Sequence, residues 1–495
     1  MLTQLLSLLA FATQVLSIPT ISAKGSKFFL DSGEQFFVKG IAYQLVEDDP
    51  LANPDQCKLD AALMQTLGTN SIRVYHVQAN QSHDECMQTF SDAGIYTWID
   101  LDTFDTYIVL DQPAWNQEKF DRYKEVMDAF HDYDNVAGFF VANELLNSGA
   151  DSVGAPYVKA AARDMKAYRD AQGYREIPVG YSAADIAELR PNLQNYMACG
   201  DDKSETLDFF SLNAYEWCGE QTFETSGYSM LQENATDYPI PIFFSETGCN
   251  TIQPRTFGDQ DAIFGPDMSG TWSGAIIYEW IEEENDYGII SYGPPTPSED
   301  IGSVIVDGYT RTGTPTPISP EFENLSSQWA AATPNSVSMA AYNPTNTAPL
   351  QCPEYTDGLW MVSADAPLPT LGQQALAATS SPRTSSGAMT TSGGSSSSVY
   401  GTVGMGSDSA MAMAMTASSS SSGGSSETTG TGFSNSNSDS DALASSSGDS
   451  SEAQQASSAD PNSSAAPSSA AAPTGEMPRQ AVAGVIACMA LVLAL

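Results

Sequence analysis

Eight short runs rich in β-branched and aromatic residues alternate with amphipathic stretches along the first two thirds of the chain. The intervening segments, such as CKLDAALMQTLG (57–68) and YVKAAARDMKAYRD (157–170), carry apolar residues at near-helical spacing. Eight strands separated by helices predict an α/β protein with a (β/α)8 TIM barrel. A doubly wound open sheet is the alternative, but no glycine-rich phosphate-binding loop follows the first run. The runs lie at 36–43, 71–77, 95–101, 136–143, 177–183, 208–215, 240–246 and 274–280.

Two glutamates stand where predicted strands end. Glu144 follows the fourth run in FFVANELLN (139–147), and Glu246 ends the seventh in FFSETGCN (243–250). In a barrel, chemistry lies at the carboxyl ends of the strands, so we expect both side chains to enter one cleft. Two carboxylates about 5 Å apart suit retaining glycoside hydrolysis, one as acid/base and one as nucleophile. Their close approach, with partial burial, is expected to raise one pKa. The alternative is that each is a structural ion-pair partner.

Neighbouring polar and aromatic residues favour a saccharide cleft. Asn143 can hydrogen-bond the sugar hydroxyl next to the reacting carbon. Aromatic side chains near the other strand ends can stack on sugar rings, although core packing is the alternative for each one alone. These aromatics are Tyr43, Tyr75, Tyr215, Trp217, Tyr278 and Trp280.

Both ends of the sequence predict export from the cell. Residues 1–17 have the leucine-rich and small residues of a secretory signal peptide, cleaved after Ser17 or alternatively after Ala23. Residues 476–495 end in an apolar tail after a polar spacer and small residues, which predicts a glycosylphosphatidylinositol (GPI) anchor propeptide, with a tail-anchored helix as the alternative. Residues 378–475 are dominated by Ser, Thr, Ala and Gly and predict a disordered, O-glycosylated stalk.

The cysteine count and the net charge restrict the compartment, the cofactors and the partners that we expect. Of seven cysteines, six lie outside the predicted anchor signal, which suits three disulfides in an oxidising compartment. There is no CxxC pair and there are only three histidines, so we expect no metal and no cofactor. A formal net charge of −42 argues against binding nucleic acid. Glycosylation sequons occur at Asn80, Asn234 and Asn324.

An ordered set of motifs over about residues 20–370 resembles glycoside hydrolase family 72, the fungal GPI-anchored β-1,3-glucanosyltransferases. The motifs are GIAYQ (40–44), RVYHV (73–77), ANELLN (142–147), SAAD…R (182–190), NAYEWCG (213–219) and FSETGCN (244–250). The resemblance implies that Glu144 is the acid/base and Glu246 the nucleophile. It implies that the donor glucan meets Tyr75, Asn143, Tyr278 and part of 102–110, which includes Asp102 and Tyr107. It also implies that Asp185 and Arg190 meet the acceptor, with a surface salt bridge as the alternative.

The same resemblance implies a domain layout and three disulfides. The catalytic domain would span 18–330, and a C-terminal extension, 331–377, would pack on the barrel through Cys352. The implied pairs are Cys57–Cys86, Cys199–Cys352 and Cys218–Cys249. The chain departs from the family pattern at Ala142, where Gly is usual, and at Thr247, where Tyr follows the nucleophile. The cysteine-rich carbohydrate-binding module of some members is not expected.

Three functional classes therefore stand side by side. The first is a retaining β-1,3-glucanosyltransferase that cleaves β-1,3-glucan and joins the new reducing end to another chain. The second is an endo-β-glucanase or mannanase of the same barrel clan, and the third is a non-catalytic glucan-binding wall protein. For the first class we expect glucan donor and acceptor as partners, a monomer, and a position on the outer face of the plasma membrane or in the wall.

Overall fold

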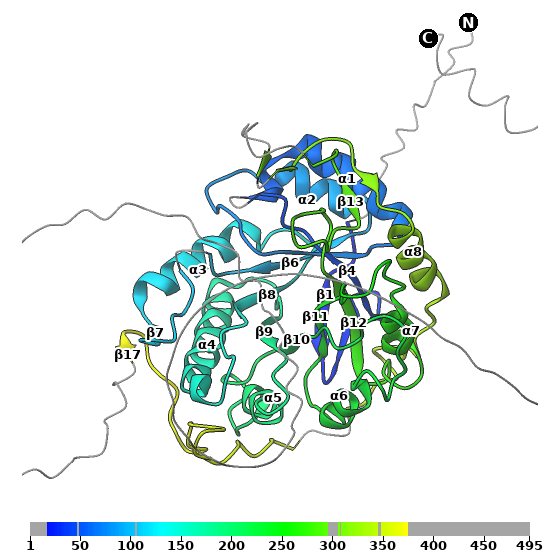
Figure 1. Ribbon diagram of the computed structural model, residues 1–495. Coiled ribbons are helices and arrows are strands. Elements are labelled where there is room, and N and C mark those ends of the chain that lie inside the picture. The colour runs from blue at the N-terminus through cyan, green and yellow to red at the C-terminus, as the bar shows by residue number, and fades with distance from the viewer. Residues whose placement is uncertain are drawn as a thin grey trace, which may run out of the picture. The chain divides into compact units, whose positions relative to one another are not determined.

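A closed barrel of eight parallel strands forms the centre of the protein (Figure 1). The structure is a computed structural model that describes residues 17–46, 49–103, 106–295, 305–306, 308–344 and 348–374. Each strand pairs with the next along the chain, and the last closes against the first. The predicted barrel is confirmed, and each of the eight predicted runs overlaps one barrel strand. The strands are β4 (Val38–Ala42), β5 (Ser71–Val74), β6 (Tyr96–Asp100), β8 (Val136–Asn143), β9 (Val179–Ala184), β10 (Phe209–Asn213), β11 (Ile242–Thr247) and β12 (Trp272–Ile277).

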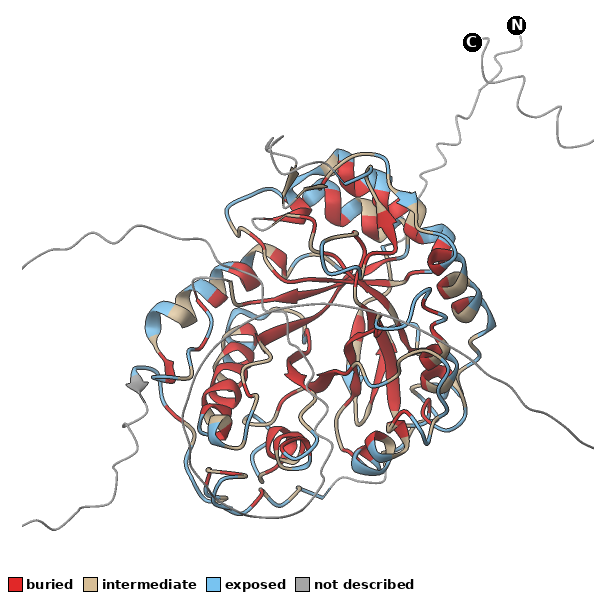
Figure 2. Cartoon of the chain, viewed as in Figure 1, coloured by how far each residue is buried: buried red, intermediate tan, exposed pale blue. Residues whose placement is uncertain are grey.

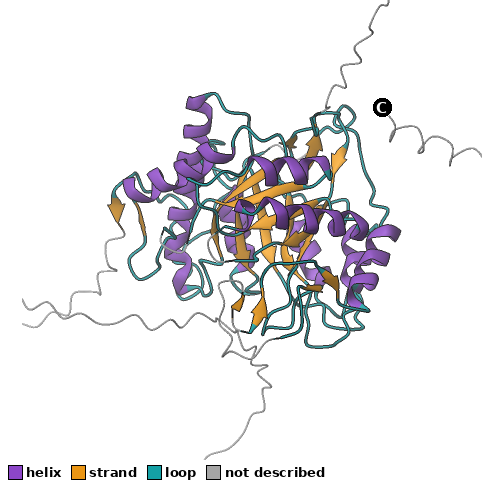
Figure 3. Ribbon diagram, turned by 90° about the horizontal axis from the view of Figure 1, so that it is seen from above, coloured by secondary structure: helices purple, strands orange, loops and turns teal. Residues whose placement is uncertain are grey.

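Helices surround the barrel, as the view from above shows (Figure 3). Local sequence explains their ends. Asn53 caps the first helix by accepting from the Gln56 amide at 3.2 Å, Pro54 opens it, and Gly68 ends it at a φ of 92° that favours glycine. The helices are α1 (Pro54–Leu67), α2 (Asp84–Asp92), α3 (Gln117–Phe130), α4 (Ala155–Gln172), α5 (Arg190–Ala198), α6 (Tyr228–Ala235), α7 (Gly258–Phe264) and α8 (Glu321–Ala331), with short 3-10 helices η1 (Pro50–Ala52) and η2 (Ala150–Gly154).

Aromatic side chains fill the part of the barrel interior that lies away from the carboxyl ends of the strands. Trp98, Phe140, Phe209 and Phe243 contact one another with ring centroids 4.9–6.4 Å apart. Phe28 packs on three of them from an N-terminal antiparallel sheet, β1 (Ile21–Lys24), β2 (Lys27–Leu30) and β3 (Gln35–Phe36). This sheet therefore closes one end of the barrel and leaves the carboxyl ends of the strands for polar groups. Gly138 is required here, because a Cβ atom would lie 2.7 Å from the Trp98 ring.

A second, larger apolar core lies between the strands and the helices. In Figure 2 the barrel strands are almost entirely buried, whereas the helices are buried on one face and exposed on the other. The segment after α8 adds to this core, because Trp360 is fully buried against Tyr196. A disulfide joins Cys199 to Cys352 in the same region. Short strands complete the fold, namely β7 (Ala114–Trp115) paired with β17 (Gln373–Gln374), β13 (Ile290–Ser291) with β16 (Thr316–Pro317), and β14 (Ile305–Val306) with β15 (Tyr309–Thr310).

Several predicted segments lie outside the described residues. These are the signal peptide apart from Ser17, the stalk at 378–475 and the anchor signal at 476–495. None of the helices in the described part of the chain combines the length and apolarity that a membrane span requires.

Asp60 is a buried acid that joins α1 to the loop after β13. Its carboxylate accepts hydrogen bonds from the Tyr43 hydroxyl at 2.8 Å, the Tyr292 hydroxyl at 2.8 Å and the Gln56 amide at 3.0 Å. Burial raises the pKa of Asp60 from 3.8 to about 6, although these hydrogen bonds act in the opposite direction. The side chain therefore takes up a proton on folding at mildly acidic pH.

We expect the protein to lose stability as pH rises from about 4 to about 6. In that range the folded Asp60 holds a proton that the unfolded chain has released, so the free energy of unfolding falls with rising pH. Burial raises the pKa of Asp259 to about 6 as well, and this adds to the same slope. Thermal unfolding between pH 4 and pH 7 measures the slope, and Asp60→Asn should flatten it. An unchanged slope in this variant would contradict the assignment.

Candidate active site

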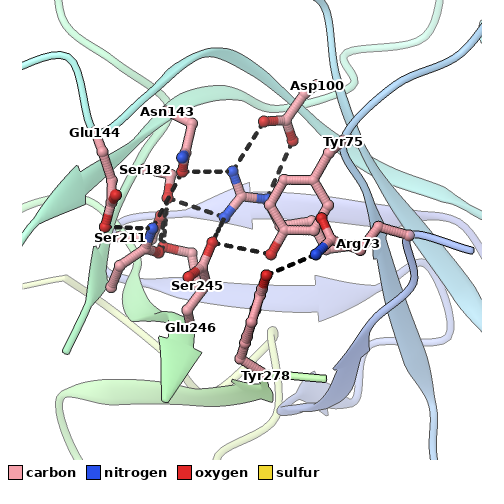
Figure 4. Close-up of polar contacts among 12 residues, drawn as sticks. Arg73, Tyr75, Asp100, Asn143, Glu144, Ser182, Ser211, Ser245, Glu246 and Tyr278 are labelled. Atoms are coloured by element: carbon pink, nitrogen blue, oxygen red, sulfur yellow. Dashed lines mark hydrogen bonds and ion pairs between the residues drawn. The ribbon is translucent and has the colours of Figure 1, made fainter. Parts of the chain in front are cut away.

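Glu144 and Glu246 lie at the carboxyl end of the barrel, as predicted (Figure 4). Glu144 follows β8, and Glu246 is the fifth of six residues in β11 and only 7% exposed. Asn213, at the end of β10, lies between them: its Nδ2 donates to Glu144 Oε1 at 3.1 Å, and its backbone is in register with Glu246. Glu144 has a φ of +46°, a strained conformation that side-chain-bearing residues rarely adopt and that is frequent at functional sites.

Three donors hold the Glu246 carboxylate. Tyr75 donates to Oε1 at 2.9 Å, Tyr215 donates to Oε2 at 2.7 Å, and Arg73 Nη1 lies 3.2 Å from Oε1. A carboxylate fixed by donors on both oxygens keeps one orientation, which is what a nucleophile must have. By contrast, the one side-chain hydrogen bond seen on Glu144 within the described residues comes from a neutral amide.

The pKa of Glu246 is raised to about 7. Burial is the largest cause, the nearby Glu144 carboxylate adds to it, and Arg73, Tyr215 and Tyr75 lower it in part. The sequence predicted that one member of the pair would have a raised pKa.

Arg73 contacts several of the polar groups around the two acids, including Glu246 itself. Its guanidinium, fully buried on β5, contacts both oxygens of Asp100 at 2.8 and 3.1 Å, and also Ser182, Asn143 and Glu246. Burial by itself would lower the pKa of Arg73, but Asp100, Tyr75 and Glu246 together more than offset this, so the pKa lies above its ordinary value. We call Arg73, Asp100, Asn143, Ser182 and Glu246 the arginine network.

The arginine network also fixes the direction of the Asn143 amide. Asn143 Oδ1 accepts from Arg73 Nη2 at 2.9 Å and from Asn213 Nδ2 at 3.1 Å. Asn213 is itself held through its oxygen by the hydroxyls of Ser182 and Ser245, at 2.9 and 2.8 Å. The Asn143 nitrogen is therefore the atom left to donate to a ligand hydroxyl.

Two of the predicted donor-binding residues lie in the segment after β6. Asp102 is half-buried, and its Oδ1 has no hydrogen-bond partner within the described residues. Burial and the adjacent Asp100 raise the pKa of Asp102 to about 7. Tyr107 is 50% exposed, and its backbone carbonyl accepts from Lys119. An unsatisfied carboxyl and an exposed ring are groups that a sugar can engage.

Tyr278 follows β12 and belongs to a group of three tyrosines beside the nucleophile. Its ring packs edge-on against Tyr215 and Tyr287, at centroid distances of 6.4 and 5.3 Å. Its hydroxyl oxygen accepts from Gln44 Nε2 at 2.6 Å. The sequence carries no signal for Tyr287, since it lies in the loop between the last barrel strand, β12, and β13.

Asp185 and Arg190 form an ion pair after β9. Arg190 Nη1 contacts both Asp185 oxygens, one of them at 2.6 Å, and the two side chains are only 4% and 6% exposed. The pairing of the alternative interpretation is present, but the pair is buried rather than on the surface. Glu216 stands beside it, and although this residue is exposed, partial desolvation of its carboxyl group and the adjacent Asp185 raise the pKa of Glu216.

All three predicted disulfides are present, namely Cys57–Cys86, Cys199–Cys352 and Cys218–Cys249. Cys218 follows β10 and Cys249 follows β11, so their bond ties the loop after β10 to the loop that directly follows the nucleophile strand β11. Thr247, one of the departures from the family pattern, has its hydroxyl 3.3 Å from Asp259 and 3.4 Å from Tyr228. It is thus part of the packing behind Glu246.

The predicted glycosylation sites differ in exposure. Asn80 and Asn234 are exposed, whereas Asn324 is half-buried in α8 and donates to the Arg255 carbonyl at 2.8 Å. Attachment of a glycan stays a prediction at all three. No group of His, Cys, Asp and Glu in the described ranges is arranged to hold a metal ion.

Sequence reasoning missed Arg73, Asp100 and Asn213 as site residues. A signal existed for Arg73, because a cation inside the apolar run SIRVYHV needs buried partners. Those partners are on other strands, so closing of the barrel was needed to identify them.

The chain is similar to proteins of known family. A family model described as Glucanosyltransferase (glycoside hydrolase family 72) matches residues 10–299. The chain is 39% identical to the 1,3-beta-glucanosyltransferase gas2 of Schizosaccharomyces pombe, over 73% of this chain and 78% of that protein. It is 39% identical to the 1,3-beta-glucanosyltransferase GAS2 of Saccharomyces cerevisiae and 41% identical to Protein EPD1 of Candida maltosa, and spans only 63% and 64% of their lengths.

Solved structures agree with the sequence comparison. Saccharomyces cerevisiae Gas2p in complex with laminaritriose and laminaritetraose aligns with a TM-score of 0.64 and 39% identity, covering 72% of this chain and 78% of that one. A mutant of the same protein with laminaritetraose and laminaripentaose aligns with a TM-score of 0.62, covering 71% and 74%. The barrel, the two acids at its strand ends and these matches together show that the chain belongs to the glucanosyltransferase family, glycoside hydrolase family 72.

Proposed function

We propose that the protein is a retaining β-1,3-glucanosyltransferase that elongates cell-wall glucan. The observation that carries the proposal is the pair of acids at the ends of β8 and β11, with Glu246 held by three donors and Glu144 by a single amide. This difference suits a fixed nucleophile and a proton-transferring acid/base. Family membership, and solved relatives with laminari-oligosaccharides, support β-1,3-glucan as the substrate.

In the first step Glu246 attacks the anomeric carbon of the donor glucan while Glu144 gives its proton to the departing glycosidic oxygen. The bond between that carbon and oxygen breaks, and a covalent glycosyl-enzyme forms on Glu246. The Tyr75 and Tyr215 hydroxyls orient the attacking carboxylate. Asn143, whose oxygen is taken by Arg73 and Asn213, binds through its nitrogen the hydroxyl next to the reacting carbon, a contact that strengthens in the transition state.

In the second step Glu144, now a carboxylate, removes the proton from the non-reducing-end hydroxyl of a second glucan. That oxygen attacks the anomeric carbon and Glu246 leaves, so the donor's new reducing end is joined to the acceptor. Water competes for the same intermediate, and transfer wins only where the acceptor is held in a productive geometry. Asp185 and Arg190 are our candidates for holding it, while Tyr75, Tyr278, Asp102 and Tyr107 contact the donor.

We also propose a setting for the whole chain. A secretory signal, an O-glycosylated stalk and a GPI lipid would place a monomeric enzyme on the outer face of the plasma membrane or in the wall. Three disulfides support folding in the secretory pathway, because such bonds persist in oxidising compartments. Release of the protein from intact cells by a phosphatidylinositol-specific phospholipase tests the anchor.

Reduced laminari-oligosaccharides test the reaction. Products longer than the donor are expected, whereas only shorter products would indicate a hydrolase of the same clan. No change in the donor would indicate a non-catalytic wall protein. The Glu246→Gln variant provides the background in the same assay.

Activity should fall on the acid side of pH 7. The nucleophile must be ionised, and the pKa of Glu246 is raised to about 7 in the free enzyme. Below that value kcat/KM for a laminari-oligosaccharide should drop about tenfold per pH unit, since kcat/KM follows the free enzyme. A kcat/KM profile that stays flat down to pH 5 would contradict this assignment.

Asp185→Ala should still cleave the donor but release more of it to water. Losing a charge-assisted hydrogen bond to the acceptor, worth about 1.5–3 kcal/mol, should lower the ratio of transfer to hydrolysis about tenfold or more. Asp185→Asn, which keeps the side-chain shape beside Arg190, separates the charge from the packing. The ratio is measured at equal donor consumption, and an unchanged ratio in both variants would remove Asp185 from the acceptor site.

A further inference from the structure

A third buried carboxylate stands next to the active site and has no part in the two chemical steps. Glu279 follows Tyr278 directly and is fully buried. Its Oε2 accepts from Gln44 Nε2 at 2.8 Å, and its Oε1 accepts from Asn285 Nδ2 at 2.9 Å. Two neutral amides therefore satisfy the two oxygens. The charged groups that bear on it are Glu246 on β11 and Arg311, which is also paired with Glu283.

The Gln44 amide contacts two side chains through the same atom. Besides Glu279, its Nε2 donates to the Tyr278 hydroxyl oxygen at 2.6 Å. An amide nitrogen has two hydrogens, so both are used, one for each partner. Tyr278 is then an acceptor toward Gln44, and its own hydroxyl hydrogen is not used in that contact, although the Glu279 carboxylate also attracts it. Tyr75 and Tyr215 differ, because both donate to Glu246.

We propose that Glu279 is a positioning residue that, as a carboxylate, holds the Gln44 amide nitrogen toward Tyr278 and so leaves the Tyr278 hydroxyl hydrogen to donate to the donor sugar. An ionised carboxylate only accepts, so Gln44 can face it only with its nitrogen. A side chain at 279 that donates would instead allow Gln44 to present its oxygen, and Tyr278 would spend its hydrogen on that oxygen. The inference rests on the proposed function, since the ligand is the donor glucan.

The ionised form is available under ordinary conditions. Burial raises the pKa of Glu279 to about 7 and the Glu246 charge adds to this, whereas the amides of Asn285 and Gln44 and the Arg311 charge lower it. At pH 8 the carboxylate therefore predominates, and the experiment is done at that pH.

Four variants of the secreted enzyme test the inference: Glu279→Gln, Tyr278→Phe, the two combined, and Glu282→Gln. Glu282 lies three residues further on in the same loop and burial also raises its pKa to about 7, so it controls for removing a nearby charge. Glu279→Gln should raise KM for laminaripentaose about five- to tenfold with little change in kcat, as loss of one hydrogen bond to bound sugar would. Tyr278→Phe should match it, and Glu282→Gln should equal the wild type.

The combined variant is decisive. If Glu279 acts through the Tyr278 hydroxyl, the double variant should be no worse than Tyr278→Phe alone. Multiplied losses would overturn the inference, because Glu279 would then act by another route. Should Glu279→Gln fail to fold, Gln44→Met removes the same amide and should show the same lack of additivity with Tyr278→Phe.

A binding measurement separates this inference from the proposed function. In a Glu144→Gln background, adding Glu279→Gln should weaken laminaripentaose binding by a similar factor in calorimetry. If the wild type turns over glucan normally but adding Glu279→Gln leaves binding unchanged, only the role of Glu279 is overturned and the proposed function stands. Absence of both turnover and binding would overturn the proposed function and this inference with it.

Discussion

Glu246→Gln is expected to lower glucan turnover by at least about 10³-fold, because no glycosyl-enzyme can form without the nucleophile. Glu144→Gln should cost about 10²–10⁴-fold, the usual contribution of a general acid/base. Both variants should remain folded. For Glu246→Gln the free energy of unfolding at pH 8 should not fall, since burial already disfavours the charged form that the amide replaces.

A substrate with a good leaving group distinguishes the two roles. A dinitrophenyl laminaribioside needs no protonation to depart, so Glu144→Gln should release a burst of phenol and then stall as the glycosyl-enzyme accumulates. Glu246→Gln should release none. Glu220→Gln, at an exposed glutamate, serves as the control and should behave as wild type. A burst of dinitrophenol from Glu246→Gln would show that Glu246 is not the nucleophile and would contradict the assigned roles.

The barrel and the two acids could be predicted because both depend on local sequence. A buried parallel strand needs a short apolar run, and eight such runs with helical segments between them leave few architectures. The position of a glutamate directly after a run then places it at the carboxyl end of the sheet. The positions of Glu144 and Glu246 could therefore be predicted without knowing which residues pair between strands.

The rest of the site depends on contacts between distant strands. Arg73 meets Asp100, Ser182 and Glu246 across separations of 27, 109 and 173 residues. No local pattern encodes such pairings, because they follow from strand register in the closed barrel. The Gln44–Glu279 contact, 235 residues apart, is of the same kind.

The N-terminal sheet β1–β3 was also not predicted. Its residues 21–36 contain apolar side chains, yet their partners are aromatic rings inside the barrel, such as Trp98 and Phe243. For Asp185 and Arg190 the sequence could predict the contact but not its burial. Their closeness could be inferred from a spacing of five residues, whereas their burial depends on the neighbouring loops.

Arg73→Met is expected to destabilise the protein by about 3–5 kcal/mol, the usual effect of removing one partner from a buried charge pair. Asp100, 3% exposed, would keep its burial and lose both guanidinium contacts. Glu246 would lose one of its three donors, so its pKa should rise above the present value of about 7 and the acid limb of activity should move to higher pH.

Urea unfolding at pH 8 measures the effect on stability. Arg122→Met is the matched control, since Arg122 pairs with Glu125 on the surface with both side chains more than half exposed, and its loss should change stability by at most about 1 kcal/mol. Combining Arg73→Met with Asp100→Asn removes the stranded charge and should recover part of the loss. If the single variant unfolds within about 1 kcal/mol of wild type, or if the double variant is less stable than the single one, the Arg73–Asp100 pair is not what holds the buried polar layer together.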